Sequence, residues 1–399
     1  MSETSTLVTF LGKGQDNKRT GYRPATYCFP DNSEKETPFF GLALADYLDA
    51  DRLVILGTSG SQWGVLVENL AERGEEERIL NLIEAEIANT VDQGMLDDLA
   101  DVMSRATGRT VLPRLIPFGK NKEEQYRILD TVAASVSNGT VNFDVTHGFR
   151  HLGMVGFLSA FMLERVRNLQ VAHLWYGALD MTDSGKTPVL KLDALTRVQR
   201  WVDALNRFDA IGDYGVFAPL LIEDGVPPDR ARCLEMAAFF ERTSNDRDTK
   251  RKLDTFLPVL NKPLTGVSGL FQNTLKGRLE WVKEQGRATR QYKLALQHLE
   301  RADFVRAAIF GLEAFITQEC SNRNRDPDKR KDREEVTKEL STAGQLSGDK
   351  YEAYQTLNAL RNTMVHGTRP KKLYALESHL GDCKKLRAVM KRKLTRLLD

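Results

Sequence analysis

Two cationic side chains near the end of the sequence, Arg361 and His366, lie five positions apart and could act together on a phosphodiester. An arginine donates charge-assisted hydrogen bonds to phosphate oxygens, and a histidine can transfer protons because its unperturbed pKa is about 6.5. Asn362 could hold either partner. Because RNA carries its own nucleophile, the 2′-hydroxyl, such a set could cleave RNA without a metal ion. The alternative is a packed helix end that contains two cations by chance.

A helix over residues 350–366 is predicted to carry these side chains. Its apolar residues recur at spacings of four, three and four: Ala353, Leu357, Leu360 and Met364. Gly367, followed by Pro370, is expected to end it. Five residues correspond to about 140° of rotation, so one helix does not direct both cations to one point. A second copy, related by a two-fold axis, could bring two such helix ends around one phosphate.

The rest of the C-terminal half has helical spacing, and strand signals fade after about residue 195. A helix over 304–316 has one apolar face: Phe304, Ala308, Gly311, Leu312 and Phe315. Prolines divide 200–265 into separate helices. The charged segment 322–350, with Ser, Gly and one Pro, is expected to contain a long loop.

This half resembles the HEPN ribonucleases, in which an arginine is followed by a polar residue and, four to six positions after the arginine, by a histidine. Here that motif reads Arg361, Asn362, Thr363, Met364, Val365 and His366. The helix over 304–316 is similar to the leading helix of such bundles. The resemblance implies that Arg361, Asn362 and His366 are catalytic and that the enzyme is a metal-independent endoribonuclease acting on single-stranded RNA.

The first half alternates strand-like and helix-like segments. Strands are predicted at 7–11, 22–29, 52–56, 141–145, 171–176 and 189–192, and helices at 39–48 and 151–166. Small residues on the second helix, Gly153, Gly156, Ser159 and Ala160, would let it lie close on a sheet. The pattern predicts a Rossmann-like α/β N-terminal domain with a mostly parallel sheet, followed by an all-α C-terminal domain.

Three polar loops follow predicted strands and are expected at one edge of the sheet, where helix N-termini and free amides favour anionic ligands. The candidate ligand-binding residues are Gly12, Lys13 and Gly14 in LGKG, then Thr58, Ser59, Gly60, Ser61 and Trp63 in GTSGSQW, then Thr146, His147, Gly148 and Arg150 in DVTHGFRH. Trp63 could stack on a base or anchor its loop in the core. In the third loop, Asp144 or Thr146 could instead cap the helix while His147 packs inside.

These three segments resemble the CARF domain, a sensor of CRISPR-associated proteins in type III systems. The resemblance implies a homodimer that binds a cyclic oligoadenylate across its two-fold axis, with cyclic tetra-adenylate as the favoured ring size. Combined with the HEPN resemblance, it divides the chain into a CARF domain over 1–195, a helical linker region over 196–265 and a HEPN domain over 266–399.

The composition is globular, with 41% hydrophobic and 28% charged residues, and no run is long enough to span a membrane. The first residues have no basic segment followed by an apolar one, so a cytoplasmic protein is expected. Four widely separated cysteines predict neither a disulfide framework nor a zinc site, and neither cofactor nor metal is expected. Nine Lys and Arg residues crowd 371–396; they suit RNA, or form a solvated helix face.

Three alternatives remain open. The helical half could bind RNA or a partner without cutting it, which makes the protein a regulator. The sensor domain could also cleave its own cyclic ligand, if Thr58, Ser59, Ser61 and Trp63 position a 2′-hydroxyl. A nicotinamide oxidoreductase would need a GxGxxG fingerprint, which GKGQDN does not provide.

Overall fold

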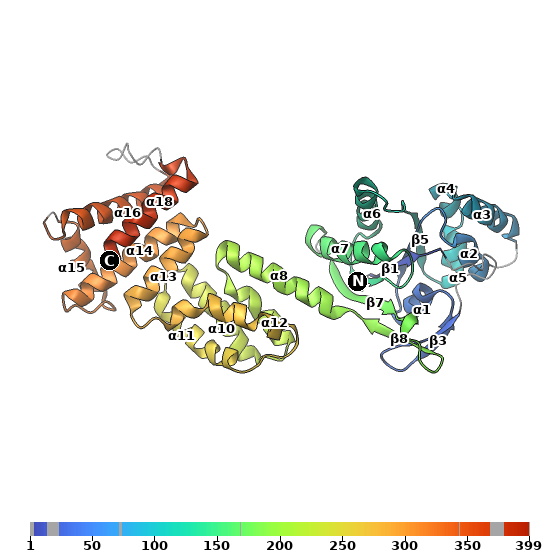
Figure 1. Ribbon diagram of the computed structural model, residues 1–399, viewed down its shortest axis with the longest axis horizontal. Helices are drawn as coiled ribbons and strands as arrows, with labels where there is room; N and C mark the ends of the chain where they lie inside the picture. Colours follow the sequence, from blue (N-terminus) through green and yellow to red (C-terminus); the bar gives the residue numbers. More distant parts are fainter. Residues whose placement is uncertain are drawn as a thin grey trace. The chain divides into compact units, whose positions relative to one another are not determined.

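The computed structural model describes residues 4–13, 24–71, 74–167, 169–342, 344–367 and 379–398. It divides into two compact units, Met1–Thr196 and Arg197–Asp399. Figure 1 shows the elements of each, and each unit is described by itself.

The N-terminal unit is built on an eight-stranded mixed sheet with the order β3-β2-β8-β7-β6-β1-β4-β5. Its strands are β1 Ser5–Leu11, β2 Ala25–Cys28, β3 Glu34–Thr37, β4 Arg52–Gly57, β5 Thr110–Leu115, β6 Thr140–Asp144, β7 Gln170–Gly177 and β8 Lys186–Lys191. From β7 to β5 all neighbours are parallel, whereas β8 runs antiparallel to β7, and β3 antiparallel to β2. The mostly parallel sheet predicted from the sequence is confirmed.

Helices cover both faces of this sheet (Figure 1). The helices of the unit are α1 Phe40–Tyr47, α2 Trp63–Leu70, α3 Glu76–Ala88, α4 Gln93–Asp97, α5 Ala100–Thr107, α6 Lys122–Ser135 and α7 Arg150–Val166. Alternate residues of a strand enter opposite cores because side chains alternate along it. In β4, Leu53 and Ile55 pack with α1 to α5, and Val54 and Leu56 pack with α6 and α7.

The small residues of α7 allow the close approach that the sequence predicted. A Cβ added at Gly156 would lie 2.9 Å from the ring of Phe10 in β1, which leaves no room for a larger side chain. Ser159 and Ala160 are buried on the same side of the helix. Helix α7 is therefore fixed directly over β1, and its first residues are held at the end of that strand.

Two strands were not predicted from the sequence, and both lie at the ends of the strand order. β3 has the polar sequence EKET, and β5 contains Pro113, which cannot donate to a sheet ladder. Edge strands need neither two apolar faces nor a complete set of donors, so they lack the pattern that identifies central strands.

The second unit is helical throughout its described part. Its elements are α8 Asp193–Ile211, which begins in the first unit, η2 Tyr214–Phe217, α9 Ala218–Glu223, α10 Pro228–Arg242, α11 Asp246–Phe256, η3 Leu257–Asn261, α12 Gly266–Arg278, η4 Glu280–Lys283, α13 Arg287–Glu300, α14 Phe304–Asn322, α15 Arg330–Leu340, α16 Gly348–His366 and α18 Cys383–Leu398. Buried apolar side chains from Trp201 to Leu397 form one continuous core. No helix in the described ranges is long and apolar enough to cross a membrane.

Helix α14 is the centre of the C-terminal bundle, and its contacts explain its apolar face. A Cβ at Gly311 would lie 2.1 Å from Leu394 of α18, so glycine allows these two helices to approach closely. Phe315 packs against Tyr354 of α16 with ring centroids 5.8 Å apart. Figure 1 shows α16 and α18 beside α14.

The expected long loop at 322–350 is wrong. Helix α15 occupies Arg330–Leu340, with Val336 and Leu340 buried on one side. Its charged residues are ordered by ion pairs to neighbouring elements: Arg333 to Glu313 of α14, and Glu339 to Arg323, at 2.7 Å. The many charged residues of this segment indicated a loop. The sequence does not show which opposite charges pair in the folded chain, so it did not reveal that these residues stabilise a helix.

Candidate functional site

The three polar loops of the N-terminal unit follow β1, β4 and β6, which lie side by side in the order β6-β1-β4. The parallel register places Leu11 beside Gly57 and Thr9 beside Asp144, so the carboxyl ends of these strands lie at one edge. After β1 the chain forms β2 and β3 at one end of the sheet, then β4 directly beside β1, and later β6 on the other side of β1. The flanking of β1 by β4 and β6 makes this edge a topological switch point. The prediction that the loops share one edge is confirmed.

The loop after β4 is held by its own buried side chains. The Ser61 hydroxyl donates to the Leu11 carbonyl at 2.7 Å and accepts from the Thr58 amide at 2.8 Å. The Trp63 indole N–H donates to the Thr58 carbonyl at 2.9 Å, and its ring is fully buried. Trp63 therefore anchors the loop and does not present its ring for stacking. Thr58 and Ser61, each 1% exposed, tie this loop to the end of β1.

The loop after β6 is organised by a buried carboxylate. Asp144 accepts the Thr9 hydroxyl at 2.6 Å and the Thr146 amide at 2.8 Å. The Thr146 hydroxyl in turn accepts the Gly177 amide at 2.7 Å, which ties the loop to β7. Burial raises the pKa of Asp144 to about 6, although its hydrogen bonds oppose that shift. Neither Asp144 nor Thr146 caps α7: its N-cap is Phe149, which makes no side-chain cap bond.

His147 packs inside the domain, as one of the two interpretations of this loop expected. It is 8% exposed and lines a small internal cavity of about 20 Å³ together with Thr9 and Gly41. Burial lowers the pKa of its imidazole to about 4, so it is neutral at physiological pH. In this conformation His147 shapes the loop from within and does not present its ring at the surface.

Among the predicted residues of the three loops that the structure describes, those that are exposed are two cations and one glycine. Lys13 and Arg150 are exposed, and neither has an ion pair among the described residues. Ser59 and Gly60 belong to the loop after β4. Within the described part of the structure, their backbone amides donate no hydrogen bond. Gly12 is buried and its carbonyl accepts the Gln62 amide at 3.1 Å, while Gly148 is exposed with φ 96°. Gly14 lies outside the described residues.

Glu86 in α3 and Asn89, which directly follows this helix, belong to this edge and were missed from the sequence. Glu86 accepts the Gly64 amide at 3.0 Å, and burial raises its pKa to about 7 even though Lys13 lowers it by its charge. Asn89, in the left-handed conformation that ends α3, faces Gly60: a Cβ built on that glycine would lie 2.2 Å from its amide oxygen and 3.9 Å from the Lys13 ammonium. Only the fold brings α3 to these loops.

The loop after β5 adds a further contribution that the sequence did not reveal, because β5 itself was not recognised. The His151 ring nitrogen lies 2.9 Å from the Phe118 carbonyl and stacks on Phe149. Lys120 lies 4.9 Å from the centre of the Phe118 ring. A cation and two aromatic rings thus flank the N-terminus of α7, next to Arg150.

The second group of predicted residues lies at the C-terminal end of α16, in the other unit. Ala353, Leu357 and Leu360 are buried, as the apolar spacing predicted, and Gly367 ends the helix with φ 62°. Asn362 accepts two hydrogen bonds from the Arg361 guanidinium, at 3.1 and 2.8 Å. Asn362 and His366 are exposed and Arg361 is half-buried. Neither cation has a carboxylate partner among the described residues.

Two other histidines of the described chain serve the fold. His298 is fully buried, lies 3.2 Å from Glu241 and stacks on Phe310. His173, in the interior strand β7, lies 3.0 Å from Asp193. No group of three or more His, Cys, Asp or Glu side chains within the described ranges could hold a metal ion.

Comparison with known proteins assigns the N-terminal unit. Residues 6–178 match the family described as the CARF domain of the CRISPR system endoribonuclease Csx1. This part of the chain is a Csx1-type CARF domain. The match confirms the resemblance on which the sensor prediction rests, and it covers all the described loops of the sheet edge.

One curated relative extends beyond the CARF domain. The CRISPR-associated protein MJ1674 of Methanocaldococcus jannaschii is 22% identical over an alignment of 281 residues, and the match covers 64% of this chain and 44% of the relative. The chain therefore spans less than half the length of that relative.

Proposed function

We propose that this protein is a ribonuclease of type III CRISPR defence whose CARF domain binds a cyclic oligoadenylate and whose C-terminal unit, of HEPN type, cleaves single-stranded RNA. The observation that carries the proposal is the Csx1-type CARF domain joined to a helical unit with Arg361 and His366 at one helix end. In a non-catalytic regulator nothing would require His366 to be exposed and both side chains to be free of carboxylate partners among the described residues.

The sheet edge suits a ring of phosphates. Lys13 and Arg150 supply positive charge that no ion pair in the described chain neutralises, and the N-terminus of the 17-residue helix α7 supplies free amides and a favourable dipole. The buried bonds of Ser61 and Asp144 fix the loops before ligand arrives, so little ordering has to accompany binding. Cleavage of the ligand at this edge is less favoured, since Thr58 and Ser61 use their hydroxyls inside the loop.

The end of α16 suits attack by the RNA 2′-hydroxyl on the adjacent phosphorus. The new O–P bond forms as the bond to the 5′-oxygen of the next nucleotide breaks, which leaves a 2′,3′-cyclic phosphate and a 5′-hydroxyl. Arg361, oriented by Asn362, stabilises the extra negative charge on the phosphoryl oxygens. A neutral His366 accepts the proton of the 2′-hydroxyl, and an imidazolium donates one to the leaving oxygen.

A homodimer would supply one neutral and one protonated His366. It would also bring Arg361 of one copy and His366 of the other to the same phosphate, although about 140° of helix rotation separates the two residues within one copy. The CARF domain offers a surface for it: Met154 and Leu158, one helical turn apart on α7, are 72% and 55% exposed. Exposed apolar side chains on a helix next to the ligand edge are typical of an interface. Ligand that bridges two copies would then change the affinity of one copy for the other, or their arrangement, and so couple the two sites.

The test is an RNA cleavage assay in EDTA with cyclic oligoadenylates of different ring size. We expect cleavage to depend on one ring size, with cyclic tetra-adenylate as the first candidate, and to leave 2′,3′-cyclic phosphate or 3′-phosphate ends. Products with 5′-phosphate ends, or a strict need for magnesium, would contradict the mechanism. Binding of a ring without any cleavage would favour the regulator.

A further inference from the structure

A basic groove lies between α16 and α18, away from Arg361 and His366. It has a volume of about 750 Å³ and is lined by Lys350, Glu352, Ala388, Lys391, Arg392, Lys393, Thr395 and Arg396. Five of the eight lining residues are cations and one is an anion. The C-terminal basic segment that the sequence singled out is therefore not evenly solvated, because part of it forms one wall of a groove.

The cations of the groove differ in whether they are already paired. Lys393 pairs with Glu352 at 2.7 Å, and Arg396 with Asp349. Lys350, Lys391 and Arg392 have no ion pair in the part of the chain that the structure describes, and the last two are exposed. The paired cations hold the helices together, whereas the other three leave net positive charge facing the groove.

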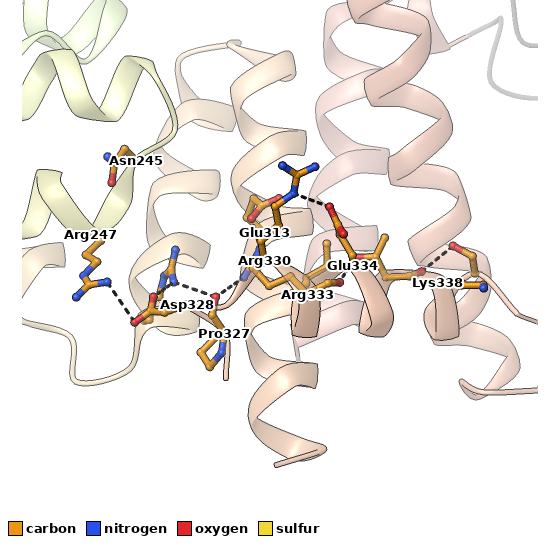
Figure 2. A pocket seen from close by; sticks show the side chains of 13 residues that line it. Asn245, Arg247, Glu313, Pro327, Asp328, Arg330, Arg333, Glu334 and Lys338 are labelled. Carbon is orange, nitrogen blue, oxygen red and sulfur yellow. Dashed lines mark hydrogen bonds and ion pairs between the residues drawn. The ribbon is translucent and has the colours of Figure 1, made fainter. Parts of the chain in front are cut away.

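A second pocket of the same unit shows the opposite arrangement (Figure 2). Its arginines are neutralised locally: Arg287 donates to Asp328 at 2.6 Å, and Arg330 donates to Glu334 at 2.6 Å. Arg333 pairs with Glu313. This pocket is an ion-pair network that orders α15, and it offers little unpaired charge to an anion.

The two ion pairs of the basic groove also give its direction. Lys393 meets Glu352 and Arg396 meets Asp349, so the residue number falls along α16 as it rises along α18. The helices are antiparallel, and α18 begins near the end of α16 that carries Arg361 and His366. At 1.5 Å per residue, the groove around Glu352 lies roughly 14 to 21 Å along α16 from these two side chains.

We propose that this groove binds the phosphate backbone of the RNA substrate several nucleotides away from the cleaved bond. The inference rests on the proposed ribonuclease function and deepens it. Unpaired lysine and arginine on a groove follow a single-stranded backbone without reading its sequence. The groove and the proposed catalytic helix end lie on one pair of packed helices, so phosphates held in the groove would direct the neighbouring nucleotides toward Arg361 and His366.

The test measures RNA binding in the non-cleaving variant His366→Ala by fluorescence anisotropy, with single-stranded RNAs of increasing length and at several salt concentrations. The groove variant adds Lys391→Gln and Arg392→Gln. The matched control adds Arg232→Gln and Lys262→Gln, an exposed arginine and lysine of the same unit that form no ion pair among the described residues. Both variants change the net charge equally.

We expect the groove variant to bind long RNA about tenfold more weakly and to lose the gain in affinity with RNA length. Its slope of log K against log salt should fall by about 1.4, since each phosphate contact on single-stranded nucleic acid contributes about 0.7. Unchanged affinity and slope, or an equal loss in the control, would overturn the groove. This assay measures binding and not cleavage, so a failure of the groove proposal leaves the proposed ribonuclease function standing. Absence of cleavage by the parent protein, measured separately, would overturn the ribonuclease function and not the binding of RNA in the groove.

Discussion

The CARF sheet edge and the end of α16 are both proposed to meet phosphate, but they are built in different ways. At the sheet edge the loops are fixed by buried hydrogen bonds, such as Ser61 to Leu11 and Thr146 to Asp144. At the end of α16, Arg361 bonds only to its neighbour Asn362 among the described residues, and His366 is exposed. One site is ordered within the described part of a single chain, whereas in the proposed mechanism the other is completed by RNA or by another copy.

The difference explains how a ligand could control a nuclease. A site that is already formed binds its ligand without a large cost of ordering, and a site that needs a second body can be switched by what brings that body near. The predictions below test each side of this contrast, beginning with the largest expected effect.

The largest effect is expected at the end of α16. His366→Ala and Arg361→Ala should each reduce RNA cleavage by about a thousandfold, because proton transfer contributes about two to four orders of magnitude and charge stabilisation about two to three. Ligand binding and the thermal unfolding midpoint should stay close to those of the parent, since neither side chain belongs to the buried stripe. Arg232→Ala, an exposed arginine of the same unit, is the control for arginine loss. Parent-like cleavage in both alanine variants would end the catalytic assignment.

Arg150→Glu should have the next largest effect, this time on ligand binding. A charge-assisted bond is worth about 1.5 to 3 kcal/mol and repulsion adds to its loss, so affinity for the activating cyclic oligoadenylate should fall about a hundredfold. Calorimetric titration measures it, and Arg167→Glu at the other end of α7 is the control. Cleavage without ligand should not change. Wild-type affinity would show that the DVTHGFR loop is not the sensor site.

Asp144→Asn should change stability, not chemistry, and tests whether the sheet edge is held by a buried carboxyl. Its folded pKa of about 6 lies above the ordinary value of 3.8, so its contribution to stability is present below 3.8 and is lost as pH rises through 6. The parent should lose about 2 kcal/mol relative to the variant between pH 4.5 and pH 7. Urea denaturation at each pH measures this difference. A constant difference across that range would mean that Asp144 titrates as an exposed carboxyl does.

The smallest effect is expected for Glu86→Gln. With a pKa of about 7, Glu86 is largely ionised at pH 8 and offsets the charge of Lys13, but it is largely protonated at pH 6. The variant should therefore bind the cyclic ligand a few-fold more tightly than the parent at pH 8 and equally at pH 6. Glu84→Gln, two residues earlier on the exposed side of α3, should not alter binding at either pH. Equal affinities of Glu86→Gln and parent at pH 8 would remove Glu86 from the sensor edge.

The sequence by itself determined the elements whose pattern is strong. Central strands such as β1 and β4 have apolar residues on both faces, and α16 has a regular apolar stripe and a glycine at its end, so their places were predicted within a few residues. Polar and glycine residues directly after three predicted strands indicated one shared ligand-binding edge of the sheet. The edge strands β3 and β5 escaped prediction because exposure on one side, and Pro113 in β5, remove the pattern that central strands require.

Only the tertiary structure decided which side chains are accessible. Trp63, Thr58 and His147 had types suited to a nucleotide, but the fold directs them inward, where they fix the loops. Glu86 and Asn89 looked like ordinary helix residues until α3 was placed against Gly64 and Gly60. Helix α15 formed where charge indicated a loop, because its ion-pair partners come from other elements. Local sequence sets local structure, whereas burial and charge pairing depend on which distant residues arrive beside a side chain.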